Sequence, residues 1–386
     1  MHRKSVYLLI LAVAALLVLG LVMLYSTSAY AHDKAAGGNP YYFLKRQSLW
    51  LGVGAVLCAT AASTDYHFWQ RTWFLWFSLS VVLLVLCFVP HIGLRLNGSS
   101  RWINLRVSAF QPSELAKLAT ITALAWWFAR DEKSAGELFR GFVYPFLGIG
   151  VLMALIAVEV DMGATALIFL TTYVIMFVAG VRWRYLIPVV LAGVGGFGYV
   201  AMHRPDRVNR LLAFLHPKEH SASFYQQLQG LIAFGSGGVE GLGLGNGRQK
   251  IGYLPFAHTD FILPNVGEEL GLRCTLSVVF FFLLIIVCGS VIATRSRDRF
   301  GLLLAFGVVV LVALQAAVNI GVTTALLPNK GMPLPFVSYG GSNLAFNLLG
   351  IGILINIYRH GVSDKEQKAA ALKLQARTQR RLFVRI

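Results

Sequence analysis

The sequence is poor in charged residues. Only 13% of its 386 residues are Asp, Glu, Lys or Arg, whereas 56% are hydrophobic. Charged groups normally cover the surface of a soluble globular protein. This composition therefore excludes an ordinary soluble protein, and we expect the excess apolar surface to face lipid.

Cysteine is also scarce. The four cysteines fall in or beside apolar runs without the spacing of metal ligands, so we expect neither a disulfide framework nor a zinc site; they are Cys58, Cys87, Cys274 and Cys288.

Acidic residues are half as many as basic ones, 17 against 34, which gives a net charge of +17. The basic residues cluster in short loops on alternate sides of the apolar runs, so the charge indicates membrane orientation and not a nucleic-acid partner.

Apolar runs dominate what remains. Runs of about 17 to 25 residues can cross a hydrocarbon core of about 30 Å as helices. The sequence has ten, at roughly 5–27, 48–63, 73–90, 113–129, 144–160, 163–180, 185–202, 272–293, 301–326 and 343–358. The first resembles a signal peptide, but it is long and nine more follow, so it is interpreted as a membrane span. The predicted fold is an all-α polytopic membrane protein with ten transmembrane helices.

The basic loops predict the orientation of these helices. Placing the basic side in the cytoplasm puts both termini there and leaves a large outer loop, about 203–271, between the seventh and eighth helices. Residues 1–360 then form one transmembrane domain, and 361–386 form a basic cytoplasmic tail that either lies against anionic lipid or is simply solvated.

Residues that lipid does not require gather in five islands, all on the outer side in this topology. They are Asn97–Lys117, Glu159–Gly163, Phe224–Lys250, Leu254–Leu270 and Leu327–Ser342. Connecting loops alone can be short and varied, so five polar islands on one face predict a shared outer cavity.

The first two islands each allow two interpretations. Lys117 could pair with Glu114, one helical turn earlier, or could join Arg101 in supplying positive charge to an anionic headgroup. Glu159 and Asp161 could bind a cation or order a tight turn between two helices.

The third and fourth islands differ in chemistry. The glycines of 235–247 suit tight turns or close approach to a ligand, but they lack the context of a nucleotide-binding loop. The fourth island is the predicted reaction centre, in which Asp260 could act as a general base toward a substrate hydroxyl. Alternatively, Asp260 or Glu268 caps the following helix.

The fifth island, with three prolines and three glycines, predicts a non-helical re-entrant segment that contributes Lys330 to the same region.

Together these motifs resemble one known family. The residues that carry the resemblance are Arg101-Trp102, Gln111-Pro-Ser-Glu-Leu-Ala-Lys117, Gly235-Ser-Gly-Gly238, His258-Thr-Asp-Phe-Ile262, Gly267-Glu-Glu-Leu-Gly271 and Pro333-Leu-Pro-Phe-Val-Ser-Tyr-Gly-Gly341. Over about residues 5 to 360 the chain is similar to the SEDS family, the glycosyltransferases of shape, elongation, division and sporulation of the FtsW and RodA type.

The resemblance implies polymerisation of lipid II into peptidoglycan strands on the outer face of the bacterial cytoplasmic membrane. Asp260 matches the family's essential outer-loop aspartate. A class B penicillin-binding protein is implied as partner, with other membrane proteins of the division or elongation machinery. The stretch Pro328–Gly331 favours the division type.

For this reaction we expect Asp260 to act as base and Arg101, Lys117 and Lys330 to balance the pyrophosphate charge. A divalent metal, Mg or Mn, could share that task, although no ligand cluster demonstrates one. Further substrate contacts are expected from Gln111, Glu268 and Ser338.

Two other functions compete with the polymerase. A lipid II flippase could use Lys117, Gln315 and Asn319 along a translocation path, although polar groups within spans also join helices. The other alternative is a catalytically silent scaffold. Loss of the essential aspartate would indicate a scaffold, but Asp260 is present.

The chain departs from the family pattern at three places: Val160 stands where proline is usual, Leu272-Arg273-Cys274 replaces smaller residues, and Asn343 replaces a frequent serine.

Overall fold

The computed structural model describes residues 2–28, 39, 41–96, 99–104, 108–202, 212, 214 and 221–361. Within them, the ten predicted spans each correspond to a helix. These are α1 (His2–Ser28), α2 (Tyr42–Ser63), α3 (His67–Leu86), α4 (Pro112–Arg130), α5 (Tyr144–Val158), α6 (Met162–Val178), α7 (Trp183–Met202), α10 (Ile262–Ala293), α11 (Arg299–Thr323) and the last helix, Gly341–Gly361. Two short helical segments, Lys133–Gly136 and Phe139–Val143, precede α5.

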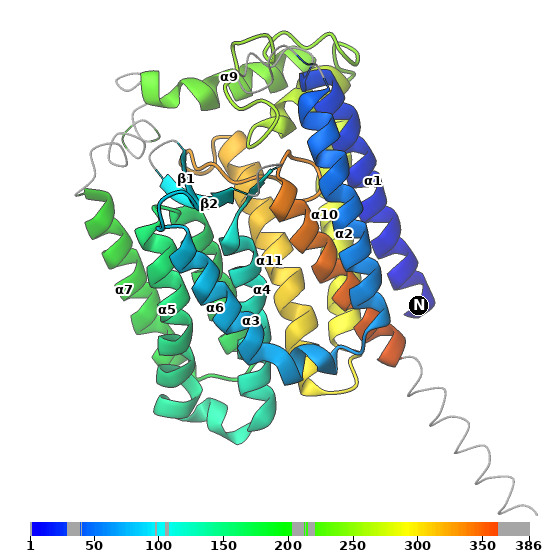
Figure 1. Ribbon diagram of the computed structural model, residues 1–386. Helices are drawn as coiled ribbons and strands as arrows, with labels where there is room; N and C mark the ends of the chain where they lie inside the picture. The colour runs from blue at the N-terminus through cyan, green and yellow to red at the C-terminus, as the bar shows by residue number, and fades with distance from the viewer. Residues whose placement is uncertain are drawn as a thin grey trace, which may run out of the picture.

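The long helices run beside one another, and α9 (Ser221–Gly237) lies across one end of the bundle (Figure 1). Six of the segments have both the length and the apolar composition of a membrane span: Lys4–Ser28, His67–Leu86, Phe139–Val158, Ile262–Ala293, Arg299–Thr323 and Gly341–Gly361. The helical membrane fold is therefore confirmed, and the exact count of ten crossings stays a prediction. The tail 362–386 lies outside the described residues.

A small antiparallel sheet, which the sequence did not predict, lies at the same end as α9, called here the outer end (Figure 1). Its strands β1 (Gly93–Leu96), β2 (Ser99–Asn104) and β3 (Ala109–Phe110) pair in that order. Gly93 pairs with Ile103, which pairs in turn with Phe110. Arg101 therefore lies on a strand, where pairing fixes the backbone that carries it.

The start of α10 differs from the prediction. The helix begins at Ile262, so residues 262–270 of the predicted outer loop are helical. Its backbone breaks at Gly271, with φ 73° and ψ −177°, directly before the predicted start of the span. The polar turns before the break are buried by protein, which is why hydropathy alone does not reveal them.

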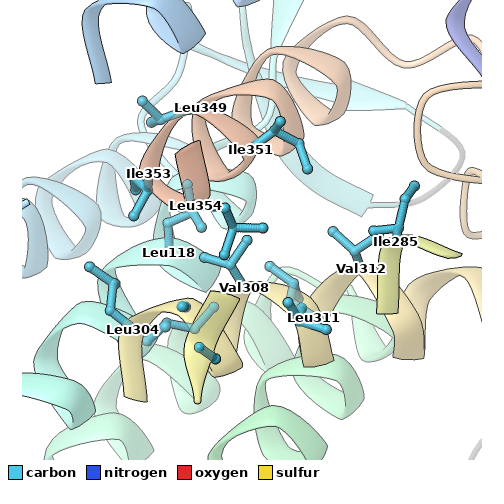
Figure 2. Packing of buried hydrophobic residues seen from close by; sticks show 14 of the residues in the cluster. Leu118, Ile285, Leu304, Val308, Leu311, Val312, Leu349, Ile351, Ile353 and Leu354 are labelled. Atoms are coloured by element: carbon cyan, nitrogen blue, oxygen red, sulfur yellow. The ribbon is translucent and has the colours of Figure 1, made fainter. Parts of the chain in front are cut away.

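The core of the bundle surrounds α11. Figure 2 shows its aliphatic side chains packed against neighbours on α4, α10 and the last helix. The labelled members are Leu118, Ile285, Leu304, Val308, Leu311, Val312, Leu349, Ile351, Ile353 and Leu354. Lipid tails are as apolar as these side chains, so the hydrophobic effect does not drive the helices together. Close van der Waals packing does so instead.

Polar contacts join two turns at the end of the bundle opposite α9. Asp298 caps α11 by accepting a bond from Gly301 N at 3.0 Å, and it also accepts one from the Tyr66 hydroxyl at 2.9 Å. The two ring nitrogens of His67 lie 3.1 Å from Asp298 Oδ2 and 2.8 Å from Asp65 Oδ1. These contacts join the α2–α3 turn to the α10–α11 turn.

Gly352 tests a close approach between the last helix and α2. A Cβ at this position would collide with the backbone carbonyl of Cys58 on α2, whereas a Cβ at Gly148 on α5 would meet nothing within 4 Å. We expect Gly352→Ala to lower the free energy of unfolding by about 1–3 kcal/mol. Gly148→Ala should leave it unchanged or slightly higher. Thermal unfolding in detergent measures both, and equal melting temperatures would contradict this account of the packing.

Candidate functional site

Asp260 lies in the turns that directly precede α10. Its backbone carbonyl accepts a hydrogen bond from Asn319 Nδ2 on α11 at 2.8 Å, and the same nitrogen lies 2.7 Å from Met332 O. A Cβ added to Gly331 would come within 2.5 Å of Asp260 Oδ2. The carboxyl of Asp260 therefore packs against the backbone of the re-entrant segment 327–340.

The re-entrant segment is held by side chains from two helices. Gln315 on α11 donates to Pro333 O at 2.9 Å. Gln47 on α2 donates to Ser338 O at 3.1 Å and accepts from Gly340 N at 3.2 Å. Ser338 is buried, and its Oγ accepts a hydrogen bond from Leu334 N at 2.8 Å within the same turn. The expected contact between Ser338 and the substrate stays a prediction.

Arg101 and Gln111 converge on Asp161. Gln111 Nε2 donates to Asp161 Oδ2 at 2.8 Å, and Arg101 Nη1 lies 3.7 Å from Asp161 Oδ1. The guanidinium of Arg101 also lies over the Trp102 ring, 4.2 Å from its centroid. Asp161 Oδ1 accepts from Ala164 N at 3.2 Å and so caps α6, which confirms the predicted role in a tight turn.

Charges from three islands act on Asp260. Burial raises the pKa of its carboxyl to about 6; the charge of Arg101 opposes this shift, that of Asp161 adds to it, and that of Lys330 opposes it. The Lys330 side chain lies beside the start of α6, since a Cβ on Gly163 would be 3.0 Å from Lys330 Cε. The predicted acid and two of the three predicted cations thus form one electrostatic group.

The turn before α6 is strained. Val160 has φ 67°, which is unusual for a β-branched residue, and its N–H donates to Ala157 O at 3.1 Å. Proline, usual at this position in the resembled family, could adopt neither feature. Glu159 beside it is buried, and its carboxylate faces the thiol of Cys87 at the end of α3.

The sequence left open whether Lys117 pairs with Glu114, and the structure shows this pair. Its ammonium lies 2.7 Å from Glu114 Oε2 and 3.4 Å from Gln315 Oε1, and it is buried inside the bundle. Asn343 Nδ2, on the last helix, donates to the same Glu114 oxygen at 3.0 Å. A small cavity lies beside this pair, lined also by Asn347. The expected contact between Lys117 and the substrate stays a prediction.

Glu268 faces the glycine-rich loop. Its carboxylate accepts bonds from Arg248 N at 2.9 Å and Gln249 N at 3.2 Å. The N-cap of α10 is Phe261, which makes no side-chain capping bond. The alternative that Asp260 or Glu268 caps this helix was therefore wrong, because the helix starts between them.

The described residues do not form an obvious metal site. They contain no group of three or more His, Cys, Asp or Glu side chains placed to hold a metal ion. Two of the groups that act on Asp260 are cations, Arg101 and Lys330. This donor set does not fit the Mg or Mn that the sequence analysis allowed, and we derive no step through a metal.

Sequence reasoning missed the residues that hold the site. Gln47 and Ser26 are buried and bond to segments distant in sequence, and only their polarity within apolar helices could have marked them; Lys250 belonged to the third island, but its bonds to α1 and α10 were not predicted. Asn343 and Asn347 lie one turn apart in the last span, and two polar residues on one face of an apolar helix are a stronger indication of a buried polar contact. Gln315 and Asn319 were expected either to line a translocation path or to join helices, and their hydrogen bonds go to Lys117 and to loop carbonyls.

Comparisons with known proteins agree on one family. The model of the FtsW, RodA and SpoVE cell cycle proteins matches residues 7–362. The probable peptidoglycan glycosyltransferase FtsW of Geobacter sp. (strain M18) is 39% identical over 92% of this chain and 98% of its own. Stage V sporulation protein E of Bacillus subtilis (strain 168) is 38% identical over 92% and 96%.

Solved structures give the same result. A chain from a peptidoglycan synthase complex that coordinates polymerization and crosslinking has a TM-score of 0.75 and 25% identity, covering 92% of this chain and 97% of that one. The rod shape determining protein RodA of Thermus thermophilus has a TM-score of 0.66 and 26% identity, covering 91% and 95%.

The Glu114–Lys117 pair yields a stability prediction. Lys117→Met leaves the Glu114 carboxylate buried without its cation, which should lower the free energy of unfolding by about 3–5 kcal/mol. Combining it with Glu114→Gln removes both charges and should restore most of this loss. Thermal unfolding of the three proteins in detergent tests the pair, and a double variant no more stable than Lys117→Met would contradict it.

Proposed function

Because this chain belongs to the FtsW, RodA and SpoVE family of cell cycle proteins, we propose that it is a peptidoglycan glycosyltransferase that polymerises lipid II into glycan strands. The observation that carries the proposal is the Asp260 carboxyl, packed against Gly331 and under the influence of Arg101 and Lys330. An acid beside cations suits a reaction that deprotonates a sugar hydroxyl and releases a pyrophosphate.

In the proposed mechanism Asp260 accepts the proton of the attacking 4-hydroxyl. A pKa of about 6 leaves the carboxylate ionised at neutral pH yet basic enough to share a proton, which is the condition for an efficient general base. The hydroxyl oxygen bonds to the anomeric carbon, and the bond from that carbon to the lipid pyrophosphate breaks. Arg101 and Lys330 stabilise the charge on the departing pyrophosphate.

The setting of this reaction follows from the same arrangement. The chain is a multi-pass membrane protein, and we propose that Asp260 lies on the periplasmic side of the bacterial cytoplasmic membrane, because the basic turns 130–140 and 295–299 lie at the end of the bundle opposite α9 (Figure 1). A class B penicillin-binding protein is the proposed partner, which fits a structural relative that belongs to a synthase complex with crosslinking. The curated FtsW relatives favour a role in division.

Transport and scaffolding are less well supported. Gln315 and Asn319, which a flippase would use along its path, hold the carbonyls of Pro333, Met332 and Asp260. A scaffold would need no acid with a raised pKa beside cations.

Asp260→Asn tests the polymerase. The variant cannot accept the hydroxyl proton, so we expect glycan synthesis from purified lipid II to fall at least 100-fold, in line with general-base contributions of about 10²–10⁴. Gel-resolved products from the protein with its penicillin-binding partner provide the measurement. Glu240→Gln is the matched control, because this acid is exposed and pairs with Arg273.

Equal activity of Asp260→Asn and wild type would remove Asp260 from the mechanism. A wild type that makes no polymer but moves fluorescent lipid II across liposomes would establish the flippase instead.

The pH dependence gives a second test. Asp260 must be ionised to act, so kcat/KM should fall tenfold per pH unit below a midpoint near 6. Arg101 stabilises the ionised form, so its removal in Arg101→Gln raises the pKa and moves the midpoint to higher pH. Arg273→Gln, an exposed arginine, should not move it. An unshifted midpoint in Arg101→Gln would contradict the electrostatic assignment.

A further inference from the structure

We propose that Ser26, Lys250 and Glu269 form a buried latch that positions Asp260 for glycosyl transfer. The inference rests on the proposed function, because it assigns these residues a role in the geometry of its base. They are positioning residues, because they bind one another and the glycine-rich part of the outer loop.

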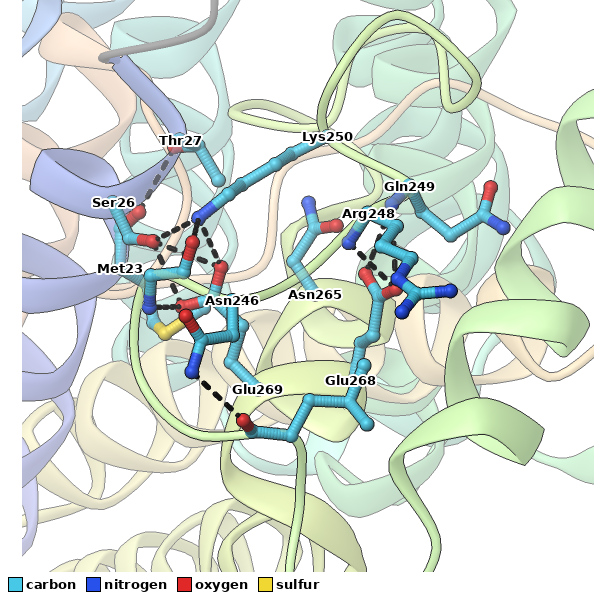
Figure 3. Close-up of polar contacts among 12 residues, drawn as sticks. Met23, Ser26, Thr27, Asn246, Arg248, Gln249, Lys250, Asn265, Glu268 and Glu269 are labelled. Carbon is cyan, nitrogen blue, oxygen red and sulfur yellow. Dashed lines mark hydrogen bonds and ion pairs between the residues drawn. The ribbon is translucent and has the colours of Figure 1, made fainter.

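The latch joins three elements distant in sequence (Figure 3). Lys250 Nζ lies 2.6 Å from Glu269 Oε1 on α10, 2.7 Å from Ser26 Oγ on α1 and 2.9 Å from Gly245 O. Ser26 Oγ in turn lies 2.8 Å from each Glu269 oxygen. The side chains of Lys250 and Glu269 are 0% exposed, so water does not screen their attraction.

The loop between α9 and Lys250 is wrapped around the two carboxylates of α10. The break at Gly271 leaves the carbonyls of Glu268 and Glu269 to accept from Leu242 N and Gly243 N, both at 2.9 Å. Glu269 Oε2 accepts from Gly245 N at 2.8 Å. Backbone and side-chain bonds thus hold the segment 242–250 in one register against α10.

The chain from the latch to Asp260 is short and packed. Leu254 N donates to Gln249 O at 2.8 Å, and Leu254, Ala257 and Phe261 are buried together. Asn265 Nδ2 donates to Ala257 O at 2.8 Å. A shift of Lys250 is therefore transmitted through these packed turns to Asp260, where a misplacement of about 1 Å can cost 100-fold in rate.

The ionic character of the latch argues for positioning over mere stability. A buried ion pair can often be replaced by apolar residues of similar volume with no loss of stability, because its desolvation offsets its attraction. Apolar packing tolerates several registers, whereas Lys250 must meet Glu269, Ser26 and Gly245 together. The charged set therefore specifies one position of the loop.

The decisive variant neutralises both charges. Lys250→Met alone leaves Glu269 buried without its cation and should lower the melting temperature. Adding Glu269→Gln should restore most of the melting temperature, while kcat for lipid II polymerisation stays 10- to 100-fold below wild type and KM changes less than twofold. A double variant with wild-type kcat would overturn the proposal, since a structural role would be restored together with stability.

Ser26→Ala provides a milder test in case the charge variants fold poorly. It removes the bonds from α1 without leaving an unpaired charge, and we expect a several-fold fall in kcat with an unchanged KM. Thr27→Val is the matched control, because Thr27 Oγ1 bonds to carbonyls of its own helix, Met23 O and Leu24 O. Equal kcat for Ser26→Ala and Thr27→Val would contradict the latch.

Wild-type activity separates the two proposals. A wild type that makes no polymer contradicts the proposed function, and the latch assignment falls with it. An active wild type with equally active latch variants contradicts the latch alone.

Discussion

The break of α10 at Gly271 is the constraint on which the outer end depends. A helix that stops making its own bonds must find other partners for its backbone groups, because an unpaired buried carbonyl is costly. Here the carbonyls of Glu268 and Glu269 accept from the glycine-rich loop, and Leu272 N donates to Gly238 O at 3.0 Å. A side chain on Gly271 would collide with the backbone of this loop, and its φ of 73° also favours glycine. The position of the glycine-rich loop against α10 therefore follows from this break.

Buried charges divide into two kinds. Glu114 with Lys117, and Glu269 with Lys250, are ion pairs at 2.7 and 2.6 Å inside the bundle or beneath the loop. Asp260 differs, since burial raises the pKa of its carboxyl and the charges of Arg101 and Lys330 oppose that shift. A closely paired carboxylate would be a poor base because its ionised form is too stable. Close ion pairs thus hold the scaffold, whereas the Asp260 carboxyl keeps a raised pKa.

Hydropathy and charge predicted most of the fold because lipid allows little besides helices whose length spans the bilayer. The polar islands predicted Asp260, Arg101 and Lys330, and the family resemblance supported Asp260; in the structure both cations act on the Asp260 carboxyl. The small sheet escaped prediction because its strands have four, six and two residues and no clear alternation. The first turns of α10 escaped because their polar residues are buried by loops distant in sequence. Contacts such as Gln47 to Ser338, 291 residues apart, leave no local pattern to read.

The turn at Glu159–Asp161 links local strain to the site. Val160 adopts φ 67°, which costs about 1–3 kcal/mol for a residue of its kind. The conformation persists because the turn satisfies several groups at once: Asp161 N donates to Ile156 O at 3.2 Å, and the Asp161 carboxylate caps α6. The same carboxylate accepts from Gln111 and faces Arg101. The strained turn at Val160 therefore fixes the position of Asp161, which faces Arg101. The charges of these two residues shift the pKa of Asp260 in opposite directions.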